Sequence, residues 1–257
     1  MVEPVSITAL AGIPEIFSGD DISDVLFCAL EANGMVLSNG DIVCIAHKII
    51  SKAEGNLIEL ADVNPSPRAK KLAEDLNKDA RKIEVILGES SEILRSFKHS
   101  EQNEGVMICE HRLGFISANA AVDESNCGSD GTVITLPRDP DFSARQIRKA
   151  IMERYQVDVG IIVTDTFGRP WRLGQVNVAI GLAGIPATRS EAGELDGWNR
   201  PLKVTEPAFA DELAATTGLV MQKSARTPVV ILKGVEWSPC ESKAADILRK
   251  KKEDMFR

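Results

Sequence analysis

Two short, almost entirely apolar segments restrict the fold of this 257-residue chain more than any other feature. Residues 41–46 (DIVCIA) and 159–163 (VGIIV) have the length and apolar character of buried strands. The first runs directly into residues 47–55 (HKIISKAEG), and the second stops abruptly at residues 164–166 (TDT). Because a sheet fixes the residues at its strand ends while the following loop leaves them accessible, we expect functional side chains directly after both strands.

Strands and helices are otherwise mixed along the chain without a strict β-α-β alternation. Helical spacing of apolar residues follows Asp20 and Asp21 as far as Gly34, and further helices are predicted over 68–87, 143–155, 209–221 and 241–257. Shorter strands are predicted over 5–10, 105–109, 113–117, 132–136, 176–180 and 228–232, with a polar loop at 166–175 and a long loop at 183–200. This mixture predicts an α+β (mixed α/β) fold. The chain reads as one unit over residues 1–257; it could contain two subdomains, but no boundary between them can be read from the sequence.

Composition excludes several classes of partner. The formal net charge of -8 argues against a nucleic-acid backbone, because binding one needs net or clustered positive charge. The five cysteines are odd in number and contain no C-x-x-C pair, which fits a reducing compartment. No signal peptide is predicted, and no window is long and apolar enough for a membrane span. We therefore expect a cytoplasmic protein without a nucleic-acid or membrane partner.

Residues 164–172 (TDTFGRPWR) place Asp165 at the carboxyl end of the second buried strand. An aspartate in this position is well placed to ligate a metal or act in catalysis, and Thr166 offers a second oxygen. Arg169 and Arg172 can form a planar, permanently charged fork for phosphate or carboxylate. The alternative is an aspartate that caps a turn and arginines that form surface ion pairs. The strand end, the arginines and a tryptophan together favour the functional interpretation.

Residues 119–126 (NAAVDESN) are too polar for a core strand. Asp123 could supply a second oxygen ligand and Asn126 a hydrogen-bonding group, while the neighbouring alanines would let the backbone approach a ligand closely. Oxygen ligands suit Mg²⁺ or Mn²⁺, which are usually shared with substrate phosphates. The alternative is a network of Asx turns that closes a loop. Sequence spacing alone does not show that Asp123 and Asp165 meet in space.

Lys48 and Lys52 are four residues apart, so on a helix they would share one face. After a strand, these lysines and the local N–H groups could hold phosphates; the alternative is a pair of ordinary solvated lysines. The chain has no G-x-x-x-x-G-K-[ST] or G-x-G-x-x-G segment, which excludes a Walker or Rossmann phosphate loop. The three histidines form no metal or triad spacing, and His99 is expected at the surface.

Four segments together, in their order and spacing, carry a resemblance to a known family. GDDI, HKIISKAEG, ANAAVDESN and TDTFGRPWRLGQVNVAIG resemble the coenzyme F420-0:γ-glutamyl ligases over residues 10–235, and DTFGRPWR is highly specific. The resemblance implies a GTP-dependent ligase that joins L-glutamate to coenzyme F420-0 and adds a further γ-linked glutamate in some members. It also implies an acyl-phosphate intermediate, release of GDP and phosphate, Mg²⁺ or Mn²⁺ with K⁺, and an intertwined homodimer with a family-specific mixed α/β fold.

The resemblance also assigns roles to individual residues. Asp123, Asp165 and Thr166 correspond to metal ligands, Lys52 to a phosphate contact, and we assign Arg169 and Arg172 to anionic substrate groups. The residues that correspond to nucleotide contacts are Ile13, Pro14, Glu15, Ile16, His47, Lys48, Lys52, Asn126, Val220, Met221, Gln222, Lys223, Ser224, Ala225, Arg226 and Thr227.

The second metal shell departs from the family pattern. The family often has Gly and then Glu or Gln after the methionine, whereas this chain has Met221-Gln222-Lys223. Gln222 is therefore taken as the oxygen donor nearest to the second metal, although the register places Lys223 at the ligand position.

Three other activities use the same residues differently. A metal-dependent phosphohydrolase would release phosphate without glutamate, and a non-catalytic GTP-binding module would bind the nucleotide without turnover. A ligase for another acid or amino acid would keep the mechanism and change the product. The sequence does not determine the number of glutamates added, the preference between Mg²⁺ and Mn²⁺, or the basis of guanine selectivity.

Overall fold

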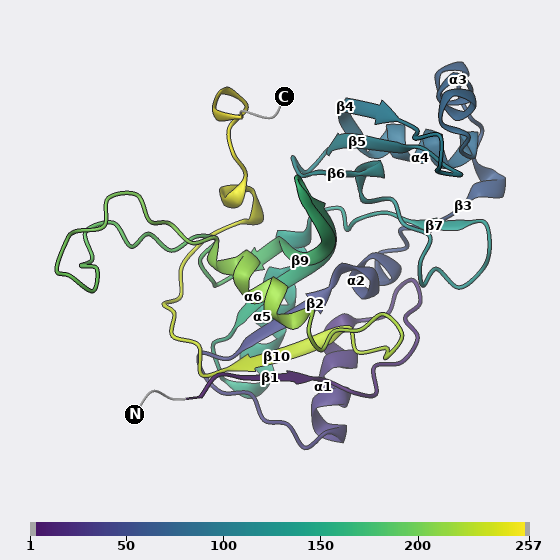
Figure 1. The fold of residues 1–257 in the computed structure, drawn as a ribbon. Coiled ribbons are helices and arrows are strands. Elements are labelled where there is room, and N and C mark those ends of the chain that lie inside the picture. The colour runs from purple at the N-terminus through teal and green to yellow at the C-terminus, as the bar shows by residue number, and fades with distance from the viewer. Residues whose placement is uncertain (1–3, 255–257) are drawn as a thin grey trace.

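The computed structural model describes residues 4–254, and a five-stranded sheet lies at its centre (Figure 1). The strand order is β1 (Ser6–Ala9), β10 (Val229–Lys233), β2 (Ile42–Ala46), β8 (Gly160–Arg169) and β9 (Arg172–Ala183). β2 and β8 run parallel, and the other neighbouring strands run antiparallel. The two predicted buried strands are thus neighbours, and Ala46 at the end of β2 lies opposite Thr164 in the middle of β8.

Three helices bury the central sheet and build the main core. α5 (Pro140–Tyr155) packs against β8 and β9, α6 (Phe209–Thr217) packs against β9, and α1 (Ile22–Ala32) packs against α5. α1 forms where predicted because Asp21 caps it, accepting from the backbone N–H of Ser23 at 2.7 Å, and because its apolar side chains are buried. The predicted mixed α/β class is confirmed.

A second group of elements lies above the central sheet in Figure 1 and has its own apolar cluster. It contains the antiparallel sheet of β4 (Ser90–Phe97), β5 (Val106–His111) and β6 (Ile116–Ala118), with α3 (Pro67–Leu76) and α4 (Ala80–Glu89). The pair β3 (Leu57–Glu59) and β7 (Thr132–Ile134) and the short helix α2 (His47–Ala53) lie between the two groups. The remaining short turns are η1 (Leu60–Asp62), η2 (Asn119–Ala121), η3 (Ala244–Ile247) and η4 (Lys251–Glu253).

Two aspartates close the free edge of β9. Asp211 accepts from the backbone N–H of Ala179 at 2.9 Å, and Asp141 accepts from that of Leu182 at 2.7 Å. An exposed strand edge is a template for aggregation, so these side chains satisfy groups that would otherwise be open to another strand. Burial raises the pKa of both carboxyl groups above the usual aspartate value, because it outweighs the backbone hydrogen bonds that lower it.

The predicted polar loop over 166–175 is wrong, because most of it continues the sheet. β8 extends to Arg169 and β9 begins at Arg172, so the segment is a hairpin that turns at Pro170 and Trp171. The backbone groups of this polar stretch are paired between the strands, while its side chains are largely exposed, which hides the strand from a hydrophobicity pattern.

Three predicted helices differ from the structure. The helix expected over 68–87 is broken, because Asn77 adopts a left-handed conformation and Asp79 caps a new helix. The helix expected over 209–221 ends at Thr217. The charged helix expected from residue 241 is replaced by η3 and η4 within the described residues, because apolar side chains span only one turn there. Residues 255–257 of that prediction lie outside the described part.

Two strands, β3 and β4, were not predicted at all, since neither shows an apolar alternation. The predicted hairpin over 105–117 is confirmed by β5 and β6. No helix in residues 4–254 is long and apolar enough to cross a membrane.

Candidate functional site

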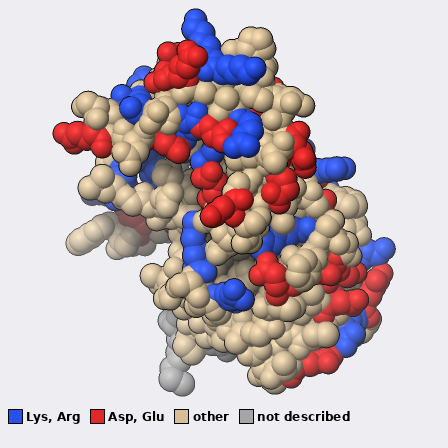
Figure 2. Space-filling model, turned by 90° about the vertical axis from the view of Figure 1, so that its right-hand side faces the viewer, with Lys and Arg blue, Asp and Glu red and all other residues tan. Residues whose placement is uncertain are grey.

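A cavity of about 670 Å³ opens between the central sheet, α2 and the 119–130 segment. In Figure 2 this face of the molecule is hollowed, with lysine and arginine side chains inside the hollow and acidic side chains along its rim. Most of the residues assigned from the sequence line the cavity, namely Ile13, Pro14, Glu15, Ile16, His47, Lys48, Lys52, Asp123, Asn126, Asp165, Thr166, Met221, Gln222, Lys223, Arg226 and Thr227.

The parallel pairing of β2 and β8 brings His47 to Asp165. His47 follows the last residue of β2 and is only 2% exposed, and its Nε2 atom lies 3.3 Å from Asp165 Oδ1. The geometry is not that of a hydrogen bond, so Nε2 is a buried polar atom without a hydrogen bond to any residue of the described range 4–254. On the other side of the ring, Nδ1 lies 3.1 Å from Ser51 Oγ. Asp165 Oδ1 also accepts from the backbone N–H of Thr166 at 2.7 Å, and this hydrogen bond restrains the orientation of the carboxylate.

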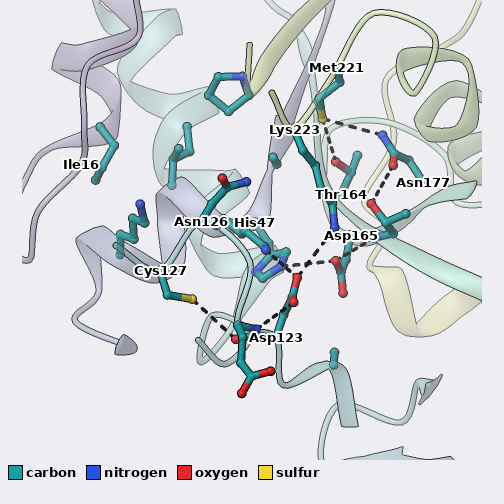
Figure 3. A pocket seen from close by; sticks show the side chains of 18 of the residues that line it. Ile16, His47, Asp123, Asn126, Cys127, Thr164, Asp165, Asn177, Met221 and Lys223 are labelled. Carbon is teal, nitrogen blue, oxygen red and sulfur yellow. Dashed lines mark hydrogen bonds and ion pairs between the residues drawn. The ribbon is translucent and has the colours of Figure 1, made fainter. Parts of the chain in front are cut away.

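Lys48 reaches Asp123 across the cavity. Its Nζ atom lies 2.5 Å from Asp123 Oδ2, and it also donates to Ser125 O and Oγ at 2.6 Å. Burial alone would raise the Asp123 pKa, but hydrogen bonds from Lys48 and Ser125 outweigh burial and hold that pKa well below its usual value. Figure 3 shows Lys223 beside the same carboxylate, with its Nζ atom 3.9 Å from Oδ2. Asp123 is therefore an ionised, positively surrounded carboxylate.

An unusual backbone places Asp123. Asn119, Ala120 and Ala121 have φ values of 52°, 48° and 56°, a run of left-handed residues that side chains with a Cβ atom rarely adopt. Asp123 then exchanges two backbone hydrogen bonds with Ile134, at 3.1 and 2.8 Å. The turn reverses the chain after β6, and the bridge to Ile134 fixes where the carboxylate emerges. Such local strain persists only where the surrounding structure holds it, and it is common at functional sites.

Two more lysines face acidic partners near the cavity. Lys52 on α2 is 8% exposed and forms a short ion pair with Glu15 of the 10–21 loop. Lys82 on α4 is 7% exposed and lies 2.6 Å from Glu124, which lines the cavity beside Asp123. Opposite charges are therefore interleaved within the site, and each buried ammonium group has a carboxylate partner.

Thr166 makes a polar contact across the hairpin. Its Oγ1 atom donates to Oδ1 of Asn177 at 3.0 Å, and the two residues are direct neighbours in the β8–β9 register. Asn177 is 8% exposed and also lines the cavity. Figure 3 shows Thr164, Asn177 and Met221 grouped above Asp165 in this view.

Five assigned residues do not line the cavity, namely Val220, Ser224, Ala225, Arg169 and Arg172. Val220, Ser224 and Ala225 belong to the 220–227 loop, and the other residues of that loop line the cavity. The two arginines lie near the turn of the β8–β9 hairpin, where Arg172 is exposed and Arg169 donates to the carbonyl of Leu173 at 3.2 Å. The structure thus separates them from the other assigned residues.

Sequence reasoning missed Glu124, Ser125 and Asn177. The first two lie inside the 119–126 segment, which was itself identified, so the signal was present but the individual roles were not. Asn177 carries a weaker signal: it is a single amide within the otherwise apolar strand 176–180 (VNVAI). An isolated polar side chain in a strand that packs against a helix needs a buried partner, and that requirement alone could have identified it.

The donor set fits a hard divalent cation. Asp123, Asp165, Thr166 and Gln222 all offer oxygen, and all line the same cavity. Within residues 4–254, no group of three or more histidine, cysteine, aspartate or glutamate side chains is placed to hold a metal by itself. A cation here would therefore also need neutral protein oxygens or substrate oxygens, which is how Mg²⁺ is usually bound beside substrate phosphates.

Comparison with known proteins gives a consistent result. Residues 12–234 match the model of the F420-0:Gamma-glutamyl ligase family. Coenzyme F420:L-glutamate ligase from Methanothermobacter thermautotrophicus is 42% identical over 256 residues, covering 98% of this chain and 99% of that protein. The protein of the same name from Methanopyrus kandleri is 42% identical over 261 residues, covering 100% and 97%. The one from Methanocaldococcus jannaschii is 41% identical over 222 residues, covering 86% of each chain.

Proposed function

The chain belongs to the F420-0:gamma-glutamyl ligase family, and we propose that it uses GTP to join L-glutamate to coenzyme F420-0 through an amide bond. GDP and phosphate are the other products, and the same chemistry could add a further glutamate by γ-linkage. The observation that carries the proposal is the convergence of the predicted metal and nucleotide segments on one cavity. Its carboxylates and lysines come from segments far apart in the sequence, and they are the kinds of group that position and stabilise a transferring phosphoryl group.

The chemistry requires activation of an acid. A carboxylate does not condense with an amine in water, so the γ-phosphoryl group of GTP first passes to a carboxylate oxygen of coenzyme F420-0, which leaves GDP. The glutamate amine then attacks the carbonyl carbon of the acyl phosphate, loses a proton and expels phosphate. Because positioning and electrostatic stabilisation supply most of the rate in such transfers, no covalent protein intermediate is required.

Lys48 and Lys52 are the proposed phosphate contacts. Both project from α2 toward the cavity, where their ammonium groups meet the carboxylates of Asp123 and Glu15. A bound nucleotide offers these ammonium groups phosphate oxygens, and positive charge near the transferring phosphoryl group lowers the barrier.

Asp123, Asp165, Thr166 and Gln222 are the residues that would hold Mg²⁺ or Mn²⁺. Such a cation, when bound, neutralises charge on the phosphate oxygens. The backbone restraints on Asp123 and Asp165 keep their carboxylates at fixed places in the cavity wall. K⁺ belongs to the proposal through the family alone, and no residue is assigned to it.

The remaining nucleotide contacts are proposed for residues 13–16, His47, Asn126 and 220–227. Arg169 and Arg172 are not proposed as nucleotide contacts, because both lie outside the cavity lining. They are expected to meet anionic groups of a substrate where it extends beyond the cavity. Arg172→Ala should therefore raise KM for coenzyme F420-0 or glutamate and leave KM for GTP unchanged.

A homodimer is also part of the proposal. Leu173 near the hairpin turn is 99% exposed, and Trp198 and Val204 in the long loop between β9 and α6 are 84% and 90% exposed. This loop extends away from the body of the molecule in Figure 1. Apolar side chains in such positions are typical of interaction surfaces. Light scattering should give twice the chain mass, and Leu173→Asp with Trp198→Asp should give the monomer mass; a monomeric wild type would refute the dimer.

Phosphate release from GTP tests the reaction. It is measured with Mg²⁺ or Mn²⁺ and K⁺, with and without coenzyme F420-0 and L-glutamate, while the deazaflavin product is weighed by mass spectrometry. Release that depends on both substrates, with a gain of one or two glutamyl units, is expected. Asp165→Asn is the inactive control, and Arg154→Gln, a surface change on α5, is the matched active control.

Other outcomes separate the alternatives. Phosphate release without glutamate would indicate a phosphohydrolase, and GTP binding without release would indicate a non-catalytic module. Release that requires a different acid or amino acid would retain the ligase chemistry and change the substrate.

A further inference from the structure

Asn177 is the central member of a series of hydrogen-bonded polar groups that begins at the proposed metal ligand Thr166. Its Oδ1 atom accepts from Thr166 Oγ1 at 3.0 Å, and its Nδ2 atom donates to Thr217 Oγ1 at 3.4 Å. Thr217 is fully buried on α6 and donates its hydroxyl to the carbonyl of Ala214 at 2.6 Å. The hydrogen bonds therefore connect the backbone of α6, through Asn177 on β9, to a residue of the cavity wall.

The number of protons on each of these side chains fixes the direction of every hydrogen bond in the series. A threonine hydroxyl has one proton, and that of Thr217 is committed to Ala214, so Thr217 can only accept from Asn177. The Asn177 amide must then turn Nδ2 toward Thr217 and Oδ1 toward Thr166. Oδ1 cannot donate, so Thr166 must give its single proton to Asn177, which leaves the Thr166 oxygen with only lone pairs to offer the cavity.

The same amide contacts the loop that carries Gln222. Asn177 Nδ2 lies 3.7 Å from the sulfur of Met221, and Thr164 Oγ1 lies 3.8 Å from that sulfur. Met221 also anchors its own end of the loop, because its N–H donates to the carbonyl of Thr217 at 2.8 Å. Gln222, the next residue, is thereby held close to the wall that contains Thr166.

We propose that Asn177 is a positioning residue of the cation site: it turns the Thr166 hydroxyl so that a lone pair faces a divalent cation, and it steadies the Met221–Gln222 segment beside it. The inference rests on the proposed function, because that function assigns Thr166 to the metal. Groups that orient metal ligands through hydrogen bonds commonly matter about 10- to 100-fold for metal affinity or activity. Asn177 suits this role because one side chain supplies both the acceptor for Thr166 and the donor for Thr217.

Mn²⁺ binding in the presence of GDP tests the inference without any turnover. The affinity is measured by calorimetry and by the electron paramagnetic resonance signal of free Mn²⁺, for the full chain. Asn177→Ala removes the acceptor and is expected to weaken Mn²⁺ binding about 10- to 100-fold. Asn177→Asp keeps an acceptor for Thr166 but loses the donor to Thr217, so it is expected to retain more Mn²⁺ affinity than Asn177→Ala, a partial rescue that a purely structural role would not produce.

Thr217→Val provides a second route if Asn177→Ala does not fold. It removes the acceptor for Asn177 Nδ2 while leaving Asn177 and the cavity wall in place, so Mn²⁺ binding should again weaken. Thr217→Ser keeps the hydroxyl and is the matched control. Thermal melting of each variant without Mn²⁺ separates a loss of cation affinity from a loss of folded protein.

Thr166→Ala distinguishes failure of this inference from failure of the proposed function. If Thr166→Ala weakens Mn²⁺ binding while Asn177→Ala and Thr217→Val bind as wild type does, the positioning role is wrong and the metal assignment survives. If Thr166→Ala also binds Mn²⁺ normally, Thr166 is not a ligand, and both the assignment of Thr166 to the metal and the positioning role of Asn177 are wrong. Absence of Mn²⁺ binding by wild type with GDP would likewise overturn the metal part of the proposed function and this inference with it.

Discussion

Replacing Asp123 by asparagine removes the negative charge that Lys48 meets in the cavity. The side-chain amide keeps an oxygen that can accept from the backbone N–H groups of Glu124 and Ser125, now at 2.8 and 3.0 Å. The ion pair with Lys48 at 2.5 Å is lost, while Lys48 stays largely buried at 15% exposure. The variant thus isolates the charge from the shape of the side chain.

The loss of unfolding free energy expected for Asp123→Asn lies between the value for an exposed ion pair and the value for a buried one. Exposed ion pairs contribute about 0.2–1 kcal/mol, and hydrogen bonds to charged groups contribute about 1.5–3 kcal/mol. The Asp123 side chain is 39% exposed, so solvent screening reduces the upper figure. We expect Asp123→Asn to lower the free energy of unfolding by about 1–2 kcal/mol, or Tm by roughly 2–8 °C.

The pH dependence follows from the low pKa of Asp123. A carboxyl group whose pKa is lowered by folding stabilises the folded state above its ordinary pKa, and the contribution is lost as pH falls through the folded value. The difference between wild type and Asp123→Asn should therefore be constant between about pH 5 and 8 and should shrink below about pH 4.

Urea unfolding in the presence of EDTA and without nucleotide measures this difference. A double-mutant cycle with Lys48→Met isolates the coupling between the two side chains. The matched control is the exposed pair of Arg154 and Glu31, also 2.5 Å apart, whose coupling should be below about 1 kcal/mol. A coupling at Lys48–Asp123 no larger than at this control, or a difference that persists unchanged at pH 3, would refute the reasoning.

Three further outcomes are expected. Asp165→Asn should abolish turnover while circular dichroism and Tm stay close to wild type; near-normal activity would remove Asp165 from the metal site. Asp211→Asn should leave the free energy of unfolding at pH 7 unchanged or higher. The raised pKa of Asp211 makes its ionisation at this pH destabilising, and asparagine still accepts from the backbone N–H of Ala179. A clear loss of stability in urea unfolding would contradict this. Ala121→Gly, at φ 56°, should raise the unfolding free energy by up to about 1 kcal/mol, since glycine relieves the left-handed strain; a loss of that size would show that the turn is not strained.

Local sequence determined the elements that have strong local signals. Residues 42–46 and 160–163 lie in buried strands because nearly all of their side chains are apolar, and α1 begins after Asp21 because that side chain caps it. The polar residues next to both apolar segments stood out by contrast, although those after Val163 continue β8 rather than follow it. Where polar side chains lie on a paired backbone, as in the β8–β9 hairpin, the hydrophobic pattern carried no signal and the prediction was wrong.

Only the tertiary structure decided which of these segments meet. Lys48 and Asp123 are 75 residues apart, and they pair because a left-handed turn and a bridge to Ile134 direct the 119–126 segment back over α2. His47 lies beside Asp165 because β2 and β8 run parallel in adjacent positions. Burial of apolar surface is non-directional, so an apolar pattern specifies that a strand is covered but not which strand lies beside it. The neighbours, and with them the site, are set by the packing of the whole chain.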